Sequence, residues 1–349
     1  MYKRYFFLSL ILLVLLLGIV AAVVFIVDPY FLYRSPIFNY SLISERYQNN
    51  GILKNFGYDA IITGTSMTEN FKASEFERLF NCKAIKVSNS GASYKEIHDR
   101  LATGFKSSNN IKYVLWGLDG GASLAADKDA MEYSDLPEYL YNDSPFDDYR
   151  YLLSKDNFAL SVNNVIRTIL KKEEKSFDDF GYWAAPFTFS KATVDSIYIR
   201  GEKTDIQHPL TEAELQTMYD NLNANVISLV ADNPSTVFLL FLPPYSIYYF
   251  DSKYTTGTLE KQLLLQEKAI ELLLQYDNVR LFSFSDDFDL VTDLDNYTDP
   301  LHYGPWVNSE ILLAMSKGEH RITRDNFEDY CRKVREFYLK YDYDGLFSP

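Results

Sequence analysis

The sequence predicts an α/β protein built on a parallel β-sheet that is covered by helices. Three short apolar runs, at residues 58–63, 83–88 and 112–118, alternate with amphipathic helical patterns. This spacing is typical of βαβ units, which join parallel strands through right-handed crossovers. A fourth run, at residues 236–242, is apolar throughout, as a central strand covered on both faces should be. The 349 residues are enough for one large domain of this class.

The composition indicates a folded protein and disfavours a nucleic-acid partner. The chain contains 28 Tyr and 25 Phe, and its hydrophobic share of 47% is too high for a disordered protein. With 48 acidic and 34 basic residues its net charge is −14, whereas phosphate binding needs clustered Lys and Arg. The same charge argues against electrostatic adsorption of the body of the protein to an anionic membrane surface.

Residues 1–28 are predicted to form a cytoplasmic tip and a transmembrane anchor. Residues 6–27 carry no charge, and about twenty apolar residues at about 1.5 Å each cross the hydrocarbon core of a bilayer. A cleavable signal peptide is the alternative, because Ala21 and Ala22 resemble a cut site, but such a signal has an apolar core of about 7–15 residues. The apolar residues continue past this pair, which favours the anchor.

The charges that flank this segment predict its orientation. Lys3 and Arg4 precede it, and Asp28 follows it. By the positive-inside rule the N-terminus stays in the cytoplasm. The rest of the chain is then extracellular, in a single-pass protein of the cell membrane.

Beyond the anchor, the sequence predicts a connector and one extracytoplasmic domain. Residues 29–56 form the connector, because Pro29 and Pro36 rule out a continuous helix. Residues 57–349 form the domain, with an insertion at about residues 122–209 where the alternation of strands and helices stops. The insertion is rich in Asp and Tyr, so it either lines a carbohydrate or acyl-acceptor groove or forms a surface lobe with its own aromatic core.

Capping boxes mark the starts of three predicted helices. Ser74, Ser93 and Thr211 each stand three residues before a glutamate, an arrangement in which both side chains satisfy N–H groups of the first helical turn. The remaining predicted elements of the core are helices at 259–276, 305–316 and 324–341 and a strand at 279–284.

A polar turn follows most of the predicted strands. The turns lie at residues 64–66, 89–91, 119–121 and 243–245, and at 299–302 beyond the last strand. The carboxyl ends of parallel strands share one edge of the sheet, and such folds bind their ligands there. Residues far apart in the sequence are therefore expected to meet at this edge.

Ser66 is the predicted nucleophile of this edge. It stands where a strand meets the N-terminus of a capped helix, whose positive partial charge favours developing anions. His302 is the predicted base, and Asp299 would fix its tautomer and stabilise the imidazolium. The alternatives are a helix cap for the serine and an ordinary turn for the acid and the imidazole.

The backbone of the same turns is predicted to stabilise an oxyanion. The N–H groups of Ser66 and Gly91 would do so, because a glycine lets the backbone approach the site closely. Gly91 is otherwise a turn glycine. Four further residues of these turns are assigned to the substrate or oxyanion region: Thr65, Asn89, Asp119 and Tyr245.

These motifs carry a resemblance to a known superfamily. In chain order, Gly64-Thr-Ser66, the Ser90-Gly91 turn and Asp299-Pro-Leu-His302 resemble the first, second and last conserved blocks of the SGNH (GDSL-like) hydrolases. The resemblance covers about residues 58–316, apart from the insertion. It implies a flavodoxin-like three-layer α/β/α fold, a Ser66-His302-Asp299 triad, and ester hydrolysis or acyl transfer through an acyl-enzyme. We expect no cofactor and no metal.

The anchor and the external domain make the chain look most like the membrane-bound branch of that superfamily. This branch acts with cell-envelope polymers and includes alginate O-acetylation and D-alanyl-lipoteichoic acid biosynthesis proteins. The likeness implies an envelope polysaccharide, a teichoic-acid-like polymer or an acyl carrier as substrate, and a membrane-bound O-acyltransferase as partner. A hydrolase and a transferase differ only in whether water or a sugar hydroxyl accepts the acyl group, and the sequence does not separate them.

The sequence departs from the pattern of the superfamily at two places. The nucleophile block reads Gly-Thr-Ser where many members have Gly-Asp-Ser. The third block normally supplies an Asn side chain to the oxyanion hole, and residues 116–121 contain none but place Asp119 in its neighbourhood. An ionised carboxylate would repel an oxyanion, so Asp119 is expected to be protonated, turned away or engaged in positioning an acceptor. The alternative function is a non-catalytic envelope component that binds polymer or a membrane acyltransferase partner.

Metal and thiol chemistry lack ligands at usable spacing. Cys82 and Cys331 fit either one disulfide or two separate thiols, and the sequence has no Cys-x-x-Cys pair and no Cys/His cluster. The three other histidines have no paired acid at comparable spacing: His98, His208 and His320.

Overall fold

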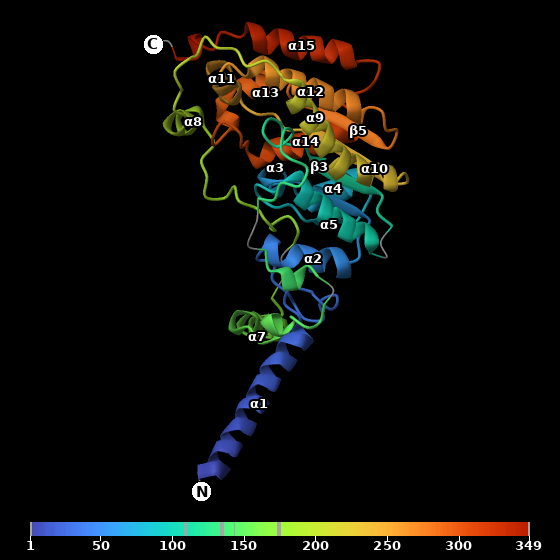
Figure 1. Ribbon diagram of the computed structural model, residues 1–349, viewed down its shortest axis with the longest axis vertical. Coiled ribbons are helices and arrows are strands. Elements are labelled where there is room, and N and C mark those ends of the chain that lie inside the picture. The colour runs from blue at the N-terminus through green and yellow to red at the C-terminus, as the bar shows by residue number, and fades with distance from the viewer. Residues whose placement is uncertain (1, 108–109, 133–135, 143, 173–175, 348–349) are drawn as a thin grey trace.

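The computed structural model describes residues 2–107, 110–132, 136–142, 144–172 and 176–347. Within these residues the chain forms a mixed α/β domain from which one long helix, α1 (Tyr2–Val27), projects (Figure 1). The α/β class predicted from the sequence is therefore confirmed.

The described part of the domain is organised around a six-stranded sheet with the order β2-β1-β3-β4-β5-β6. Neighbouring strands are parallel, except that β5 and β6 are antiparallel. All five predicted strands are present, and β6 is an edge strand of two residues that no sequence pattern marks. The strands are β1 (Ala60–Thr63), β2 (Ala84–Lys86), β3 (Tyr113–Gly117), β4 (Val237–Leu242), β5 (Val279–Ser283) and β6 (Arg321–Ile322).

Helices pack on both faces of this sheet because its central strands are apolar on both sides. Ile61 and Val114 belong to one buried cluster, whereas their neighbours Ile62 and Leu115 belong to the other. The first cluster includes residues of α2 (Glu45–Asn55), α5 (Tyr94–Lys106), α9 (Glu212–Leu222), the π-helical η2 (Asn223–Ile227), α10 (Ser228–Asp232) and α12 (Leu259–Leu273). The second includes residues of α4 (Ala73–Phe80), α11 (Ile247–Thr255), α13 (Phe288–Thr292), α14 (Pro305–Lys317) and α15 (Phe327–Lys340).

Two of the three predicted capping boxes are confirmed. Ser93 caps α5 and Thr211 caps α9, each with the reciprocal glutamate hydrogen bond. The third prediction, at Ser74, is wrong, because α4 begins at Ala73. The side chain and the N–H of Ser74 instead donate to the carboxylate of Asp178, at 2.6 and 2.9 Å. Asp178, in the insertion, thus accepts the N–H of Ser74 that Glu77 was expected to accept.

The segment expected to connect the anchor with the domain is itself part of the core. Phe31, Leu42 and Ile52 are buried in the first apolar cluster. A Cβ on Gly51 would lie 2.1 Å from the backbone oxygen of Tyr30, so helix α2 packs directly on the start of the segment. The end of α1 is therefore held against the domain rather than separated from it by a free linker.

The insertion contributes helices and loops but no strand among its described residues. Its first half includes η1 (Glu138–Leu140), α6 (Tyr149–Leu152) and α7 (Lys155–Ile169), of which α6 and α7 pack beside α1. Its second half includes α8 (Lys191–Ile197) and returns to the carboxyl edge of the sheet, where Trp183 meets the predicted catalytic residues. Part of the Asp- and Tyr-rich run, at residues 133–135 and 143, lies outside the described residues.

Helix α1 is the one described helix long and apolar enough to cross a membrane, judged by length and composition. Its side chains are exposed over most of its length, and Val24 and Val27 are its buried residues. The orientation across a membrane stays a prediction.

Candidate active site

The turn after β1 places Ser66 at the carboxyl edge of the sheet. Gly64 has φ 138°, and a Cβ there would lie 2.8 Å from the methyl group of Thr68, so this position needs a glycine. Thr65 then caps α3 (Ser66–Glu69), its Oγ1 accepting the N–H of Met67 at 3.4 Å. The predicted capped helix is a single turn of four residues, so the helix dipole adds little at Ser66.

The loop that carries His302 is preorganised by Asp299. Oδ1 of Asp299 accepts the N–H groups of Leu301 and His302 at 2.8 and 2.9 Å. Its Oδ2 lies 2.7 Å from Nδ1 of His302. Burial acts to raise the pKa of Asp299, but these hydrogen bonds and the imidazole outweigh it and leave the pKa below its usual value. The carboxylate is therefore ionised and fixes the imidazole ring.

Ser66 and His302 meet across the site. Oγ of Ser66 lies 2.8 Å from Nε2 of His302, although 236 positions separate the two residues. With the Nδ1 proton directed to Asp299, Nε2 is the nitrogen available to accept the hydroxyl proton. The three residues form one hydrogen-bonded chain in the order required of a nucleophile, a base and an orienting acid.

Further hydrogen bonds, besides those among Ser66, His302 and Asp299, hold the two loops together. The hydroxyl of Tyr303 and the amide of Asn308 both donate to the backbone oxygen of Met67, at 3.4 and 3.1 Å. The N–H and the hydroxyl of Ser246 donate to the oxygen of Pro300 at 3.1 and 2.8 Å. The serine turn, the histidine loop and the turn after β4 are thus held as one unit.

Asp119 lines the same cavity as Ser66 and His302, and its carboxylate accepts hydrogen bonds from two hydroxyl groups. Its Oδ2 accepts from Thr65 and its Oδ1 from Tyr245, both at 2.7 Å. Burial raises the pKa of Asp119, and the two hydroxyl donors oppose that rise. The carboxylate sits where a third-block Asn was expected, and it ties the residue before Ser66 to the turn after β4.

Gly91 and Asn89 occupy different positions relative to the site. Gly91 has φ 69° and lines the same cavity as Ser66 and His302. Asn89 is buried and does not line the cavity; its N–H donates to the oxygen of Gly64 at 2.9 Å. Its side-chain Nδ2 has no hydrogen-bond partner within the part of the chain that the structure describes.

The candidate site opens into a cavity of about 280 Å³. Leu301 and Met67 supply apolar walls. Tyr249 and Lys253 line it from α11, with the Lys253 ammonium 4.8 Å from the centre of the Tyr249 ring. Burial alone lowers the pKa of Lys253. Besides His302, Lys253 is the one basic side chain among the described residues that line this cavity.

Sequence reasoning missed the contributions of the insertion and of α11. Nε1 of Trp183 donates to the backbone oxygen of Ser66 at 3.0 Å, and its ring meets the edge of His302 at a centroid distance of 5.2 Å. No local signal marks Trp183, because its partners lie far away in the chain. Ser246 directly before an apolar run is the signal that could have revealed α11, since serine is a favoured N-cap residue.

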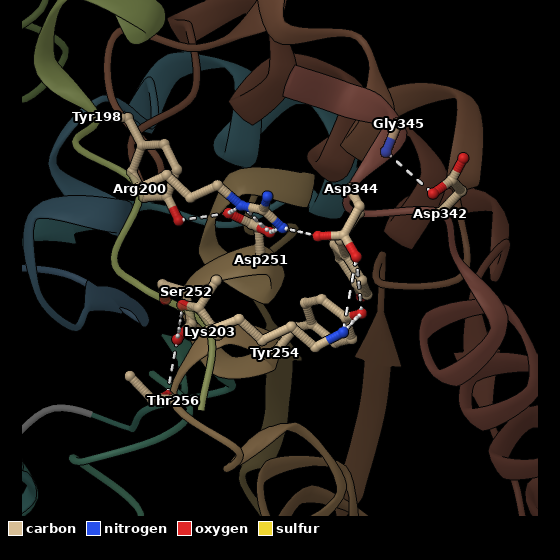
Figure 2. A network of polar contacts seen from close by, with 12 residues as sticks. Tyr198, Arg200, Lys203, Asp251, Ser252, Tyr254, Thr256, Asp342, Asp344 and Gly345 are labelled. Atoms are coloured by element: carbon tan, nitrogen blue, oxygen red, sulfur yellow. Dashed lines mark hydrogen bonds and ion pairs between the residues drawn. The ribbon is translucent and has the colours of Figure 1, made fainter. Parts of the chain in front are cut away.

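A polar network holds α11 in place through residues that do not line the cavity (Figure 2). Asp251 is fully buried and accepts from the hydroxyl of Tyr198 at 2.7 Å and from Nε of Arg200 at 3.1 Å. Arg200 also pairs with Asp344 at 2.6 Å, and Asp344 accepts from the hydroxyl of Tyr254 at 3.2 Å. The end of the insertion and the C-terminal segment therefore clamp the helix that carries Lys253.

Other parts of the described chain offer less chemistry. A larger cavity of about 890 Å³ lies between β6 and α15 and includes the pair His320 and Asp286, 3.1 Å apart, but no serine, threonine or cysteine lines it. The described residues contain no group of three or more His, Cys, Asp or Glu that could hold a metal ion. Cys82 and Cys331 are two separate free thiols.

Comparisons with known proteins add little to this geometry. No family model matches the chain, and no curated protein matches it. The chain is similar to a solved structure from Streptococcus pneumonia that is provisionally described as a platelet activating factor. The TM-score is 0.39 at 12% identity, over 82% of this chain and 91% of that one. A likeness of this degree carries no argument about function.

Proposed function

We propose that this protein is a membrane-anchored, extracytoplasmic serine esterase or O-acyltransferase of the SGNH type. Its substrates would be acyl groups of a cell-envelope polysaccharide or a teichoic-acid-like polymer. The observation that carries the proposal is the chain of two hydrogen bonds, at 2.8 and 2.7 Å, that joins Ser66, His302 and Asp299. The strand order 2-1-3-4-5 supports it as well, because flavodoxin-like sheets have this order and bind ligands at their carboxyl edge.

In the proposed reaction, Oγ of Ser66 attacks the acyl carbonyl carbon while Nε2 of His302 accepts the hydroxyl proton. The tetrahedral intermediate collapses to an acyl-serine, and His302 returns the proton to the departing alcohol. Water or a sugar hydroxyl then gives its proton to His302 and attacks the acyl-serine, and His302 returns that proton to Oγ of Ser66 as the acyl–Oγ bond breaks. Asp299 stays ionised and stabilises the imidazolium in both halves.

The N–H groups of Ser66 and Gly91 are the proposed oxyanion donors, since both residues line the cavity. Asp119 is proposed to position them rather than to bind the oxyanion. Its carboxylate accepts from Thr65 and Tyr245, so it fixes the turn that presents Ser66.

The cavity also bears on the substrate class. Lys253 places a half-buried cation beside Ser66 and His302, which suits an anionic group near the ester. An acidic polymer or a phosphate-bearing acyl carrier would supply one. A membrane-bound O-acyltransferase is the proposed partner, which would deliver the acyl group to the external domain.

The test of this proposal is a comparison of two serine variants. We expect Ser66→Ala to lower the kcat for acyl-ester turnover by at least about a thousandfold. Ser123→Ala should keep most of the activity, because Ser123 lines the same cavity but lies outside the hydrogen-bonded chain. Equal turnover by wild type and Ser66→Ala would refute the enzyme. Product analysis with and without polysaccharide acceptor separates hydrolysis from transfer.

One observation favours a second candidate, a non-catalytic envelope component that binds polymer or a membrane acyltransferase. The third block supplies Asp119 instead of an amide donor, and its carboxylate is engaged elsewhere. A fluorophosphonate probe decides between the two functions. Labelling that is lost in both Ser66→Ala and His302→Ala supports the enzyme, whereas no labelling of folded wild-type protein supports the binding component.

A further inference from the structure

Helix α7 carries a stripe of exposed apolar side chains opposite its fully buried ones, while the partly buried Phe158 and Leu160 pack on the apolar cluster of Val24 and Tyr151. Its buried residues are all polar: Asn157, Ser161 and Asn164. Its large exposed apolar residues, with the C-cap residue included, are Val162, Ile166, Ile169 and Leu170, which are 38, 47, 72 and 60% exposed. Each set recurs at intervals of three and four residues, so the two sets occupy opposite faces. This is the reverse of the pattern of a helix that packs on a domain in water.

Hydrogen bonds fix this outward orientation. The amide of Asn157 donates to the backbone oxygen of Tyr151 at 2.9 Å. At the other end of the helix, the hydroxyl of Thr168 accepts the N–H of Asn39 at 2.7 Å. Turning the apolar face inward would break both contacts, so the exposed stripe is a built feature of the fold.

The position of α7 identifies what covers this stripe. The helix packs directly against α1 and α6, next to a small apolar cluster that joins Val24 of α1 to Tyr151. Figure 1 shows α7 across the domain-proximal end of α1, on the side of the domain from which α1 projects. Because Val24 and Val27 are the buried residues of α1, α7 lies level with its last two turns. In a bilayer crossed by α1, that level is the boundary between acyl chains and headgroups.

We propose that α7 is an in-plane membrane helix whose apolar face lies in the outer leaflet of the bilayer that α1 crosses. Phe146 and Leu153, shortly before the helix, are exposed apolar side chains as well. The proposal rests on the membrane anchoring included in the proposed function and is independent of catalysis. Insertion of this kind is favoured by buried apolar area as well as by attraction to anionic lipids, and the apolar contribution does not require a basic protein surface.

Two attachments, α1 and α7, would stop the domain from rotating about a single anchor. Figure 1 places α3, which begins at Ser66, on the far side of α2 from α1. The candidate active site would then be held at a set height above the lipid surface, open to a polymer rather than to the bilayer.

The test measures the depth of single fluorescent labels in the full-length protein. The protein, with Cys82→Ser and Cys331→Ala, is reconstituted in vesicles of phosphatidylcholine and phosphatidylglycerol, with or without bromine on the acyl chains. Labels are attached at Ile166→Cys or Ile169→Cys in α7, at Leu15→Cys within α1, and at Ile199→Cys. Ile199 is 89% exposed and lies two residues beyond α8, which Figure 1 places at the end of the domain away from α1. Circular dichroism confirms that each variant is folded.

We expect brominated lipid to lower the fluorescence at positions 166 and 169 by at least about twofold, as at position 15, and to leave position 199 unchanged. Quenching at 15 but not at 166 or 169, with both α7 labels open to aqueous iodide, overturns the proposal and leaves the anchor intact. Labels on α7 that neither quencher reaches show that a protein covers this face, which also overturns it. No quenching at position 15 refutes the anchor itself, and the proposal with it.

Discussion

At the scale of single residues, the two acids of the candidate site differ in the donors that their carboxylate oxygens accept. Asp299 uses one oxygen for two backbone N–H groups and the other for His302. Asp119, by contrast, uses both oxygens for hydroxyl groups. The two acids thus make different contacts at this edge: Asp299 orients the imidazole of His302, and Asp119 joins the turns next to Ser66.

Lys253 should determine the preference for anionic esters. We expect Lys253→Met to raise the KM for an acetylated sugar phosphate by about 10- to 100-fold, the cost of one charge-assisted hydrogen bond. The KM for an acetylated neutral sugar should change little. Lys253→Arg keeps the charge and serves as the matched control. An equal effect of Lys253→Met on both esters would contradict an electrostatic role.

Tyr245 should stabilise the ionised form of Asp119. Tyr245→Phe removes one of the two hydroxyl donors, so the pKa of Asp119 should rise further and the free energy of unfolding should fall by about 1–3 kcal/mol at pH 8. The loss should become smaller as the pH is lowered, because protonation of Asp119 removes its need for the donor. Denaturation of both proteins at pH 8 and at lower pH measures this. Tyr249→Phe is the control, because its hydroxyl is not one of the two donors; a pH-independent loss in Tyr245→Phe would speak against the assignment.

At the scale of elements, strands and most helix starts follow from local pattern, whereas positions governed by distant partners do not. The capping boxes at Ser93 and Thr211 form as predicted because both partners lie within one turn. The predicted capping box at Ser74 does not form, because Ser74 donates instead to the carboxylate of Asp178, far away in the sequence. Helix α11 was not predicted for a related reason. The proline pair at 243–244 ends β4, and the helix that follows is held by contacts with residues distant in the sequence.

The clamp on α11 predicts a stability effect remote from the site. Arg200→Met leaves the fully buried carboxylate of Asp251 without its charge partner, so we expect the free energy of unfolding to fall by about 3 kcal/mol. The KM should rise too, because α11 carries Lys253. Asp344→Asn removes only the exposed outer contact of the network (Figure 2) and should change stability little. Equal effects of the two variants would show that the buried pair is not the important contact.

At the scale of the whole molecule, segments from across the chain converge beside the site. Glu69 ends α3, Glu45 begins α2, and Gly181 of the insertion leaves room for both, since a Cβ there would lie 2.6 Å from an oxygen of Glu45. Burial, and then the neighbouring carboxylate of Glu45, raise the pKa of Glu69 to about 7. The packing of these segments therefore buries the carboxyl group of Glu69 and favours its protonated form.

This group should make the stability of the protein depend on pH. Between about pH 4.5 and 7, folded protein keeps a proton on Glu69 that unfolded protein has released, so the free energy of unfolding should fall by about 3 kcal/mol as pH rises through this range. Glu69→Gln removes that term, and its melting temperature should gain on wild type as pH rises from 4.5 to 8. Glu202→Gln, at an exposed position, is the control. A constant difference between Glu69→Gln and wild type would contradict the prediction.

The sequence by itself determined the α/β class, five of the six strands, the apolar N-terminal helix and the edge of the sheet at which the candidate site lies. These follow from periodicity and from the rule that parallel strands end at one edge, which are local or topological properties. It also identified Ser66, Asp299 and His302 as candidate site residues, because polar turns after apolar strands are visible without coordinates.

Only the tertiary structure decided that Ser66 and His302 lie within hydrogen-bond distance, that Asp119 faces Thr65 and Tyr245, and that Trp183 and Lys253 join the site. Only the tertiary structure, likewise, turned the apolar face of α7 outward beside α1. Each of these depends on contacts between residues distant in sequence, and the direction of a side chain in such contacts is set by packing rather than by its neighbours in the chain.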